Sequence, residues 1–303
     1  MELKVIDSHV HFPAFDFMGD GKSMGGLDLK GNEWVDWDKA KWRLAWRFPD
    51  SIDPVTEEDE EETTEKWYEE VKKSNIEKII FVTAGGNEKA YKILKKHPDK
   101  FIMYAHHAPD NANSAEELEK CIKEKGFKGY KLLGPRIDTP LNDKSLYPVW
   151  ETAQKYEIPV LIHFGILGGA GGIANHVNIN PLIIHDVARA FPKVRFIIPH
   201  FGCGYVFETL QLGWACPNVS IDTSGSNQWM RWMPYDLDLI KLFTKYYNTF
   251  GYERIIFGTD SSWFPRGFTK AYLDEQIRAM VYSGFHENEI DAVLYGNINR
   301  LID

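Results

Sequence analysis

Two histidines near the start of the chain, His9 and His11, are spaced as a pair of metal ligands would be. They lie at the end of the apolar run 4–12, and side chains two positions apart on a strand point to the same face. Two later apolar runs are closed by His163 and His200, and a third by Asp260. Imidazoles and a carboxylate suit a borderline divalent ion such as zinc and leave a position open for water.

A divalent ion held in this way would supply a nucleophile near neutral pH, because binding lowers the pKa of a water molecule to about 7. Beside that water, His200 could act as a general base or hydrogen-bond a developing oxyanion. A His-x-His pair alone is weak support, since histidines also occur as polar surface on strands. The prediction therefore depends on a fold that brings the four run ends together.

The elements that must position these residues alternate regularly along the chain. Their composition predicts strands over 4–12, 78–83, 101–105, 127–133, 158–163, 194–200, 219–223 and 254–260. Helices are expected over 56–73, 87–96, 145–156, 181–191, 207–214, 235–247, 269–282 and 287–301, with another capped by Ser114. Eight such units in sequence predict an α/β fold, a (β/α)8 TIM barrel whose strand ends share one mouth. A doubly wound sheet is less favoured, because Asp-Ser-His-Val-His stands where its glycine-rich turn would be.

One long segment interrupts the alternation after the first strand. Residues 13–55 show no clear period but contain Trp34, Trp37, Trp42 and Trp46. Long loops without secondary structure are uncommon in compact domains unless they are lids, binding loops or linkers. We therefore predict an ordered lid inserted into a single domain that spans residues 1–303.

Composition excludes several classes of partner. The chain has 303 residues, with 44 acidic against 35 basic side chains, which argues against a nucleic-acid surface. Cys121, Cys203 and Cys216 have no paired spacing, which indicates a reducing compartment. No apolar run approaches the roughly 20 residues of a membrane helix, and no signal peptide is visible. We expect a cytoplasmic protein with no membrane partner.

The strand-end residues also carry a family resemblance. The stretch Asp7 to His11, together with His163, His200 and Asp260, resembles the metal-dependent amidohydrolase superfamily. Three further stretches resemble its amidohydrolase-related branch, which includes aminocarboxymuconate semialdehyde decarboxylase, resorcylate-type decarboxylases and hydrolases: residues 127–132, 198–202 and 295–301.

The resemblance implies one divalent metal ion, with zinc expected first and manganese as the alternative. Its ligands would be His9, His11, His163 and Asp260, and His200 and Asp260 would be the catalytic residues. Lys131 ends the fourth strand, where other members of the superfamily carry a carboxylated lysine that bridges two metals. In this branch the resemblance favours one metal, and a two-metal site bridged by Lys131 is the alternative.

Two reactions fit this set of residues. We favour a hydrolase, in which metal-activated water attacks a small ester, lactone or amide, because Ser261-Ser262-Trp263 departs from the decarboxylase pattern. The alternative is decarboxylation of a conjugated or aromatic acid. A catalytically silent metal-binding barrel is a second alternative, but it predicts an incomplete ligand set.

The substrate is expected to be a small molecule that bears a carboxylate. Lys131, Arg266 and Arg136 are the predicted contacts for it, because each is placed at a strand end or in a mouth loop. Asp222, at the end of the seventh strand, is left open as a site residue. His106 and His107 close the third strand, where a structural role is favoured over contact with substrate. A homodimer is compatible with the sequence.

Overall fold

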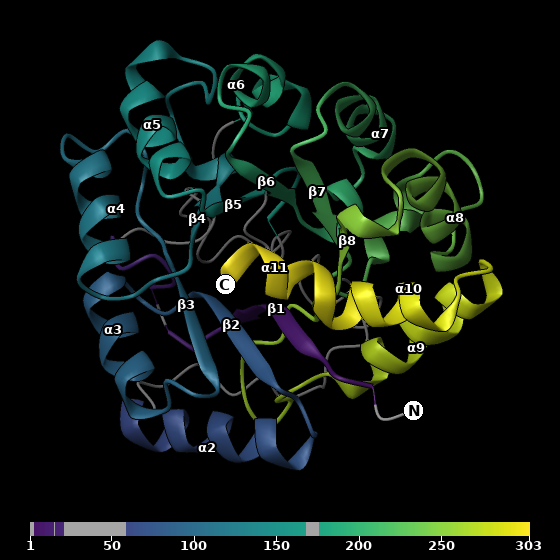
Figure 1. Cartoon of the computed structure of the whole chain (residues 1–303), viewed down its shortest axis with the longest axis horizontal. Helices are drawn as coiled ribbons and strands as arrows, with labels where there is room; N and C mark the ends of the chain where they lie inside the picture. Colours follow the sequence, from purple (N-terminus) through teal and green to yellow (C-terminus); the bar gives the residue numbers. More distant parts are fainter. Residues whose placement is uncertain (1–2, 15, 21–58, 168–175) are drawn as a thin grey trace, which may run out of the picture.

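The computed structural model describes residues 3–14, 16–20, 59–167 and 176–303. Eight parallel strands follow one another in chain order around one sheet (Figure 1). They are β1 (Ile6–His11), β2 (Lys78–Thr83), β3 (Phe101–Ala105), β4 (Gly129–Leu133), β5 (Pro159–His163), β6 (Arg195–Ile198), β7 (Val219–Asp222) and β8 (Ile255–Ile256). Val10 and Ser261 form a parallel bridge between β1 and the segment after β8. The sheet is therefore a nearly closed barrel, and the predicted TIM barrel is confirmed.

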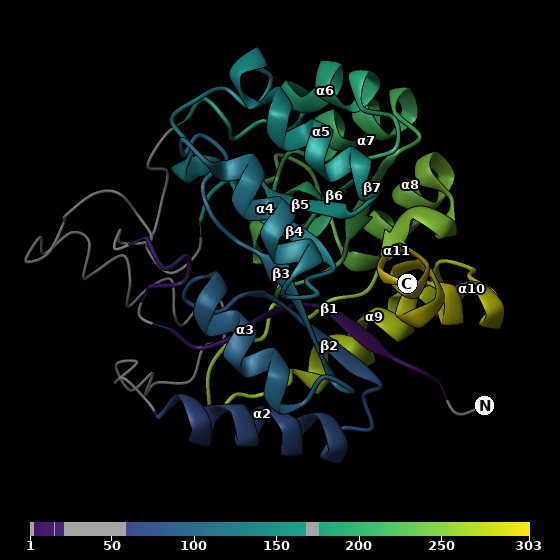
Figure 2. The same ribbon diagram turned by 60° about the vertical axis from the view of Figure 1, so that its left-hand side comes forward.

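Helices alternate with these strands and surround the barrel (Figures 1 and 2). They are α2 (Glu60–Lys73), α3 (Asn87–Lys96), α4 (Ser114–Lys123), α5 (Tyr147–Lys155), α6 (His185–Ala190), α7 (Val206–Ala215), α8 (Leu239–Phe250), α9 (Lys270–Tyr282), α10 (Glu287–Asp291) and α11 (Asn297–Ile302). Most lie outside the sheet, but α11 crosses the end of the barrel where the strands begin (Figure 1).

Apolar side chains fill both faces of the sheet, as expected for parallel strands that are covered by helices. The larger cluster lies between the strands and the outer helices. A second cluster fills the barrel interior and joins Ile6, Ile80 and Ile197 to Ile298 and Ile302 of α11. The interior is thus a packed core that α11 closes at one end, which leaves the other end, the mouth, for chemistry.

An irregularity in β1 sets the direction of its histidines. Asp7 lies opposite Ile79, and Val10 lies opposite Phe81, so β1 uses one more residue than β2 over this stretch. Such a bulge shifts the alternation of side chains between the two faces of a sheet. His9 consequently points into the barrel although it is three positions from Ile6, which also packs in the interior.

Several predicted boundaries need correction. Ser114 is the first residue of α4 rather than its cap, and the N-cap position is occupied by Asn113. The helix expected at residue 235 begins at Leu239, because the Asp238 side chain accepts a hydrogen bond from the Lys241 backbone and caps it there. The last predicted helix, 287–301, is divided by a π-helical turn over Ala292–Gly296.

Most of the predicted lid, and all four of its tryptophans, lie outside the described residues. The start predicted for the helix at residue 56 also lies outside them, and the described helix α2 begins at Glu60 after an Asp59 cap. In the part of the chain that the structure describes, no helix is long and apolar enough to cross a membrane.

Candidate metal centre

Side chains from the ends of three strands meet at the mouth. Nε2 of His9 lies 3.3 Å from Nε2 of His11. Oδ1 of Asp260, just beyond β8, is 3.2 Å from Nε2 of His11 and 3.7 Å from Nε2 of His9. His200, just beyond β6, joins this group, since ligand atoms of His9, His200 and Asp260 all lie within 4.8 Å of one another. Three of the four predicted ligands, His9, His11 and Asp260, therefore converge here together with His200, the predicted catalyst.

The donor chemistry of this cluster fits a cation. Nδ1 of His9 is 2.8 Å from Oδ2 of Asp222, an acceptor, so the proton of the neutral ring belongs on Nδ1. Nε2 of His9 then carries a lone pair that faces the Asp260 carboxylate, another acceptor. Two acceptors this close favour a cation near both, and the Lys131 ammonium lies 3.4 Å from Nε2 of His9. A divalent ion held by His9, His11 and Asp260 would also fit between them.

Each imidazole of the pair is oriented by a partner on its far side. His9 donates to Asp222 at the end of β7, and Nδ1 of His11 is 2.6 Å from the Thr83 hydroxyl at the end of β2. Partners of this kind fix the ring orientation of metal-binding histidines and raise their basicity. Asp222, left open in the sequence, is thus part of the centre, whereas Thr83 was not predicted at all.

Burial places these groups in the protonation states that bind metals. Burial lowers the pKa of His9 to about 3, with a further contribution from the positive charge of Lys131. It also lowers the pKa of His11 and, strongly, that of His163. Burial alone would raise the pKa of Asp260, but its hydrogen bond with His11 and the neighbouring imidazoles bring it well below the ordinary value. The imidazoles are therefore neutral and the carboxylate is ionised.

Two of the site residues have an unusual backbone. His200 has φ 56° and Asp260 has φ 59°, both in the left-handed region that non-glycine residues rarely adopt. Hydrogen bonds hold both of them, from the His200 N–H to Asp222 at 3.2 Å and from the Asp260 N–H to the His9 carbonyl at 2.8 Å. Such conformations cost about 1–3 kcal/mol each and cluster at functional sites.

His163 ends β5 as predicted, and its ring lies 5.1 Å from that of His200 between centroids. Its Nε2 is 3.2 Å from the Ile166 carbonyl. Binding an ion through Nε2 would therefore exchange this hydrogen bond for the metal. The role of His163 as a ligand stays a prediction.

Lys131 lies inside the barrel, fully buried, with Nζ 3.4 Å from Nε2 of His9. Burial lowers the pKa of this lysine to about 8, against the opposing charges of Asp222 and Asp260. A buried cation at this depth can bind a carboxylate strongly, because water does not screen it. Its role as a substrate contact, and the two-metal alternative, stay predictions.

The two predicted arginines already have partners within the protein. One terminal nitrogen of Arg136 lies 2.9 and 3.1 Å from the two Asp20 carboxylate oxygens. The Arg266 guanidinium lies over the ring of Trp263, at 5.0 Å from its centroid, and also contacts Tyr272. Contact of either arginine with substrate stays a prediction.

The histidines at the end of β3 have a different environment. Nε2 of His106 accepts hydrogen bonds from the backbone N–H groups of Ala84 at 3.1 Å and Gly86 at 2.9 Å. Its Nδ1 donates to the Tyr104 carbonyl at 3.0 Å. His107 likewise has a partner on each ring nitrogen. Both histidines are structural, as favoured from the sequence.

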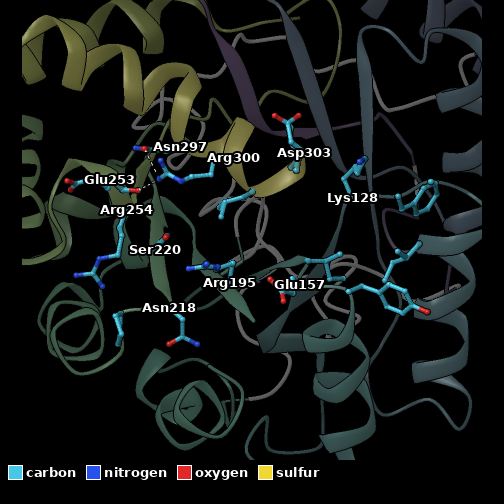
Figure 3. A pocket seen from close by; sticks show the side chains of 18 residues that line it. Lys128, Glu157, Arg195, Asn218, Ser220, Glu253, Arg254, Asn297, Arg300 and Asp303 are labelled. Atoms are coloured by element: carbon cyan, nitrogen blue, oxygen red, sulfur yellow. Dashed lines mark hydrogen bonds between the residues drawn. The ribbon is translucent and has the colours of Figure 1, made fainter. Parts of the chain in front are cut away.

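A cavity of about 530 Å³ lies at the opposite end of the barrel, beside α11 (Figure 3). Lys128, Arg195 and Arg300 line it together with Glu157 and Asp303. None of the strand-end histidines or carboxylates of the mouth lines this cavity. It is therefore separate from the candidate metal centre.

The fold and the site together define the class of protein, a (β/α)8 barrel with a histidine and carboxylate cluster at its mouth. Residues 6–303 match the family described as "Amidohydrolase". The chain therefore belongs to the amidohydrolase family, and the resemblance seen in the sequence is confirmed.

Similar proteins cover more than one reaction. The chain is 26% identical over 212 residues to a 2-keto-4-carboxy-3-hexenedioate hydratase from Sphingobium sp. (strain NBRC 103272 / SYK-6). This match covers 63% of the chain and 61% of the relative, so it spans less than two thirds of the relative's length.

Solved structures share the barrel over nearly the whole chain. An uncharacterised TIM-barrel protein from Bordetella bronchiseptica is 21% identical with TM-score 0.67, covering 99% of this chain and 98% of its own. A manganese-bound dihydroxybenzoic acid decarboxylase from Polaromonas sp. JS666 is 18% identical with TM-score 0.62 and coverages of 99% and 97%. A "probable 2-pyrone-4,6-dicarboxylic acid hydrolase" from Acinetobacter baumannii, with citric acid bound, is 16% identical with TM-score 0.60 and coverages of 99% and 99%. At these identities the likeness shows the fold alone.

Proposed function

We propose that this chain is a metal-dependent hydrolase that uses water to open a small ester, lactone or amide bearing a carboxylate. The proposal rests on the exposure of the Asp260 side chain to solvent. The His9 side chain is fully buried and that of His11 is 15% exposed, whereas Asp260 is 36% exposed. An ionised carboxylate that belongs to the donor cluster and still reaches solvent is placed to receive a proton from an attacking water.

The proposed site holds one divalent ion through His9, His11, His163 and Asp260. Three imidazoles among four ligands favour zinc, while the manganese in the related decarboxylase supports manganese as the alternative. When bound, the ion would polarise the substrate carbonyl and make water a better nucleophile at neutral pH.

The residues of the chain would then divide the remaining work. Oδ1 of Asp260 faces the imidazoles, so Oδ2 is the atom left to take the proton and later return it to the leaving group. His200, buried beside His9, would accept a hydrogen bond from the attacking water through Nε2 and assist Asp260 in moving the proton to the leaving group. Lys131 would bind the substrate carboxylate, with Arg136 and Arg266 as further contacts nearer the loops.

Decarboxylation of a conjugated or aromatic acid is the second candidate. The structural likeness to the dihydroxybenzoic acid decarboxylase favours it, because that protein shares this barrel over its full length. The silent-barrel alternative is less favoured, since donor atoms of His9, His11 and Asp260 lie within 3.7 Å of one another at the mouth. A cytoplasmic location, supported by the unpaired cysteines, and a homodimeric assembly complete the proposal.

Solvent labelling separates the reactions. The Zn²⁺- or Mn²⁺-loaded protein is incubated in ¹⁸O-labelled water with a panel of small carboxylated lactones, esters and amides and a panel of hydroxybenzoates. A hydrolase transfers ¹⁸O into the new carboxylate of its product. A decarboxylase releases carbon dioxide, takes its new ring hydrogen from solvent, and leaves the aromatic product free of ¹⁸O. Turnover of hydroxybenzoates alone would reject the hydrolase.

Two controls accompany this assay. Replacing His200 by Asn should abolish turnover while the metal stays bound, because His200 is not one of the four proposed ligands. Metal analysis should find about one ion per chain, and a substoichiometric value would reject the mononuclear centre.

A further inference from the structure

The carboxylate of Asp222 contacts residues that follow or belong to other strands of the barrel. It ends β7, is fully buried, and its Oδ2 is 2.8 Å from Nδ1 of His9. Its Oδ1 accepts hydrogen bonds from the backbone N–H of Ser224 at 2.9 Å, from the backbone N–H of His200 at 3.2 Å, and from the Ser224 hydroxyl. Oδ2 therefore contacts β1, and Oδ1 contacts the segments that follow β6 and β7.

We propose that Asp222 is a positioning residue that sets the tautomer of His9. The Oδ1 side of Asp222 is filled by three donors, so its carboxylate cannot rotate without leaving N–H groups unpaired in a buried place. Oδ2 is consequently fixed as an acceptor facing Nδ1 of His9. The proton of the neutral ring is held on Nδ1, and Nε2 presents its lone pair to His11 and Asp260.

Ser224 strengthens this arrangement from the other side. Its hydroxyl has one proton, which goes to Asp222, so its oxygen is an acceptor toward Nδ1 of His200 at 2.9 Å and toward Nδ1 of His9 at 3.1 Å. The Ser224 carbonyl, 3.1 Å from Nδ1 of His200, is also an acceptor. In its neutral form His200 therefore carries its proton on Nδ1 as well. Asp222 and Ser224 together thus direct the Nε2 lone pairs of His9 and His200 toward the same position in the mouth.

Replacing the Asp222 carboxylate by an amide tests this proposal directly. In Asp222→Asn the carbonyl oxygen must take the Oδ1 position, because three donors point there. The amide NH₂ then faces Nδ1 of His9 in place of an acceptor and shifts the proton of His9 toward Nε2, against the one remaining acceptor near Nδ1, the Ser224 hydroxyl oxygen at 3.1 Å. Affinity for Zn²⁺ should fall by roughly 10–100-fold, the range for loss of an outer partner of a ligand.

The matched control is Asp186→Asn. Asp186 also accepts from a histidine, with Oδ1 2.9 Å from Nδ1 of His185, but this pair is exposed on α6. Its Zn²⁺ affinity should equal that of the wild type. Ser224→Ala removes one of the three donors and the weaker 3.1 Å contact of the hydroxyl with Nδ1 of His9, but it leaves the Asp222–His9 hydrogen bond, so its Zn²⁺ affinity should change by much less than that of Asp222→Asn.

The test combines Zn²⁺ titration against a competing chelator with long-range ¹H–¹⁵N correlation spectra of histidine-labelled, metal-free protein. The His9 signal is assigned as the one lost in His9→Gln. In the wild type its proton should be on Nδ1, and in Asp222→Asn on Nε2. A wild-type proton on Nε2 would overturn the proposal whatever the variants do, as would a Ser224→Ala loss of affinity equal to that of Asp222→Asn.

This inference rests on the proposed metal centre but not on the proposed reaction. Both readouts are obtained without substrate, so a failed search for hydrolysis leaves the tautomer result standing. Conversely, a wrong tautomer would leave the ¹⁸O assay as a valid test of the reaction.

Discussion

The histidines that end β1 and those that end β3 look alike in the sequence and differ in the structure. Burial lowers the pKa of His9 to about 3 and that of His106 to about 4. Both ring nitrogens of His106 are occupied by backbone groups, whereas Nε2 of His9 faces His11 and Asp260 of the candidate metal centre. The partners of the second nitrogen, rather than burial or the pKa, therefore distinguish a proposed ligand from a structural histidine.

The largest expected difference is in metal binding and activity. His9→Ala removes a proposed ligand, so the protein should lose stoichiometric Zn²⁺ and all turnover. His106→Ala removes no ligand, so the molecules that remain folded should keep one ion each. Metal analysis of the folded fraction of each variant makes the comparison. Equal metal loss in the two would show that the β1 and β3 histidines are not functionally distinct.

Stability should separate the two histidines less than metal binding does. His106→Ala leaves the backbone N–H groups of Ala84 and Gly86 without an acceptor, at a cost of about 1–3 kcal/mol each. His9→Ala leaves Oδ2 of the buried Asp222 without its donor and Nζ of the buried Lys131 without its acceptor. Urea unfolding of the metal-free proteins should therefore show both variants destabilised by about 2 kcal/mol or more. A His9→Ala protein as stable as the wild type would mean that the contacts of His9 with Asp222 and Lys131 do not contribute to folding.

The stability of the metal-free protein should fall as the pH drops from 6.5 to about 4. Over this interval the unfolded chain protonates His106 at its ordinary pKa of 6.5, while burial keeps the folded residue neutral down to about 4. The difference corresponds to about 3 kcal/mol. His106→Gln should be less stable at pH 7 but lose about 3 kcal/mol less on acidification. Parallel urea titrations of both proteins would measure this, and identical slopes would contradict it.

The smallest effect is expected at the far side of His11. Thr83→Val keeps the shape of the side chain but removes the hydroxyl 2.6 Å from Nδ1 of His11. Zn²⁺ affinity should fall by about tenfold, the lower end for an outer partner. The loss should be smaller than in Asp222→Asn, because a neutral hydroxyl fixes the ring less strongly than a carboxylate does. Equal losses would remove that distinction.

The strand ends were predictable because alternation and apolar runs place them without knowledge of the pairing. His9, His11, His200 and Asp260 were found in this way, and β2 and β3 have the predicted bounds. The hydrogen-bond partners of these residues could not be predicted, because contacts such as that of His9 with Asp222 depend on the bulge in β1 and on closure of the barrel.

The structural role of His106 was favoured in the sequence but not explained by it. That role depends on backbone N–H groups of the loop after β2, and Gly85-Gly86 was the one visible sign of such a loop. The lid over 13–55 lies mainly outside the described residues and stays a prediction.

Closure of the barrel by α11 has a kinetic consequence. Ile298 and Ile302 fill the interior at the end of the barrel where the strands begin, so in the proposed enzyme substrate and product would both pass through the mouth. A product that keeps its carboxylate would still bind Lys131 on its way out. We therefore expect the proposed enzyme to show competitive inhibition by its product.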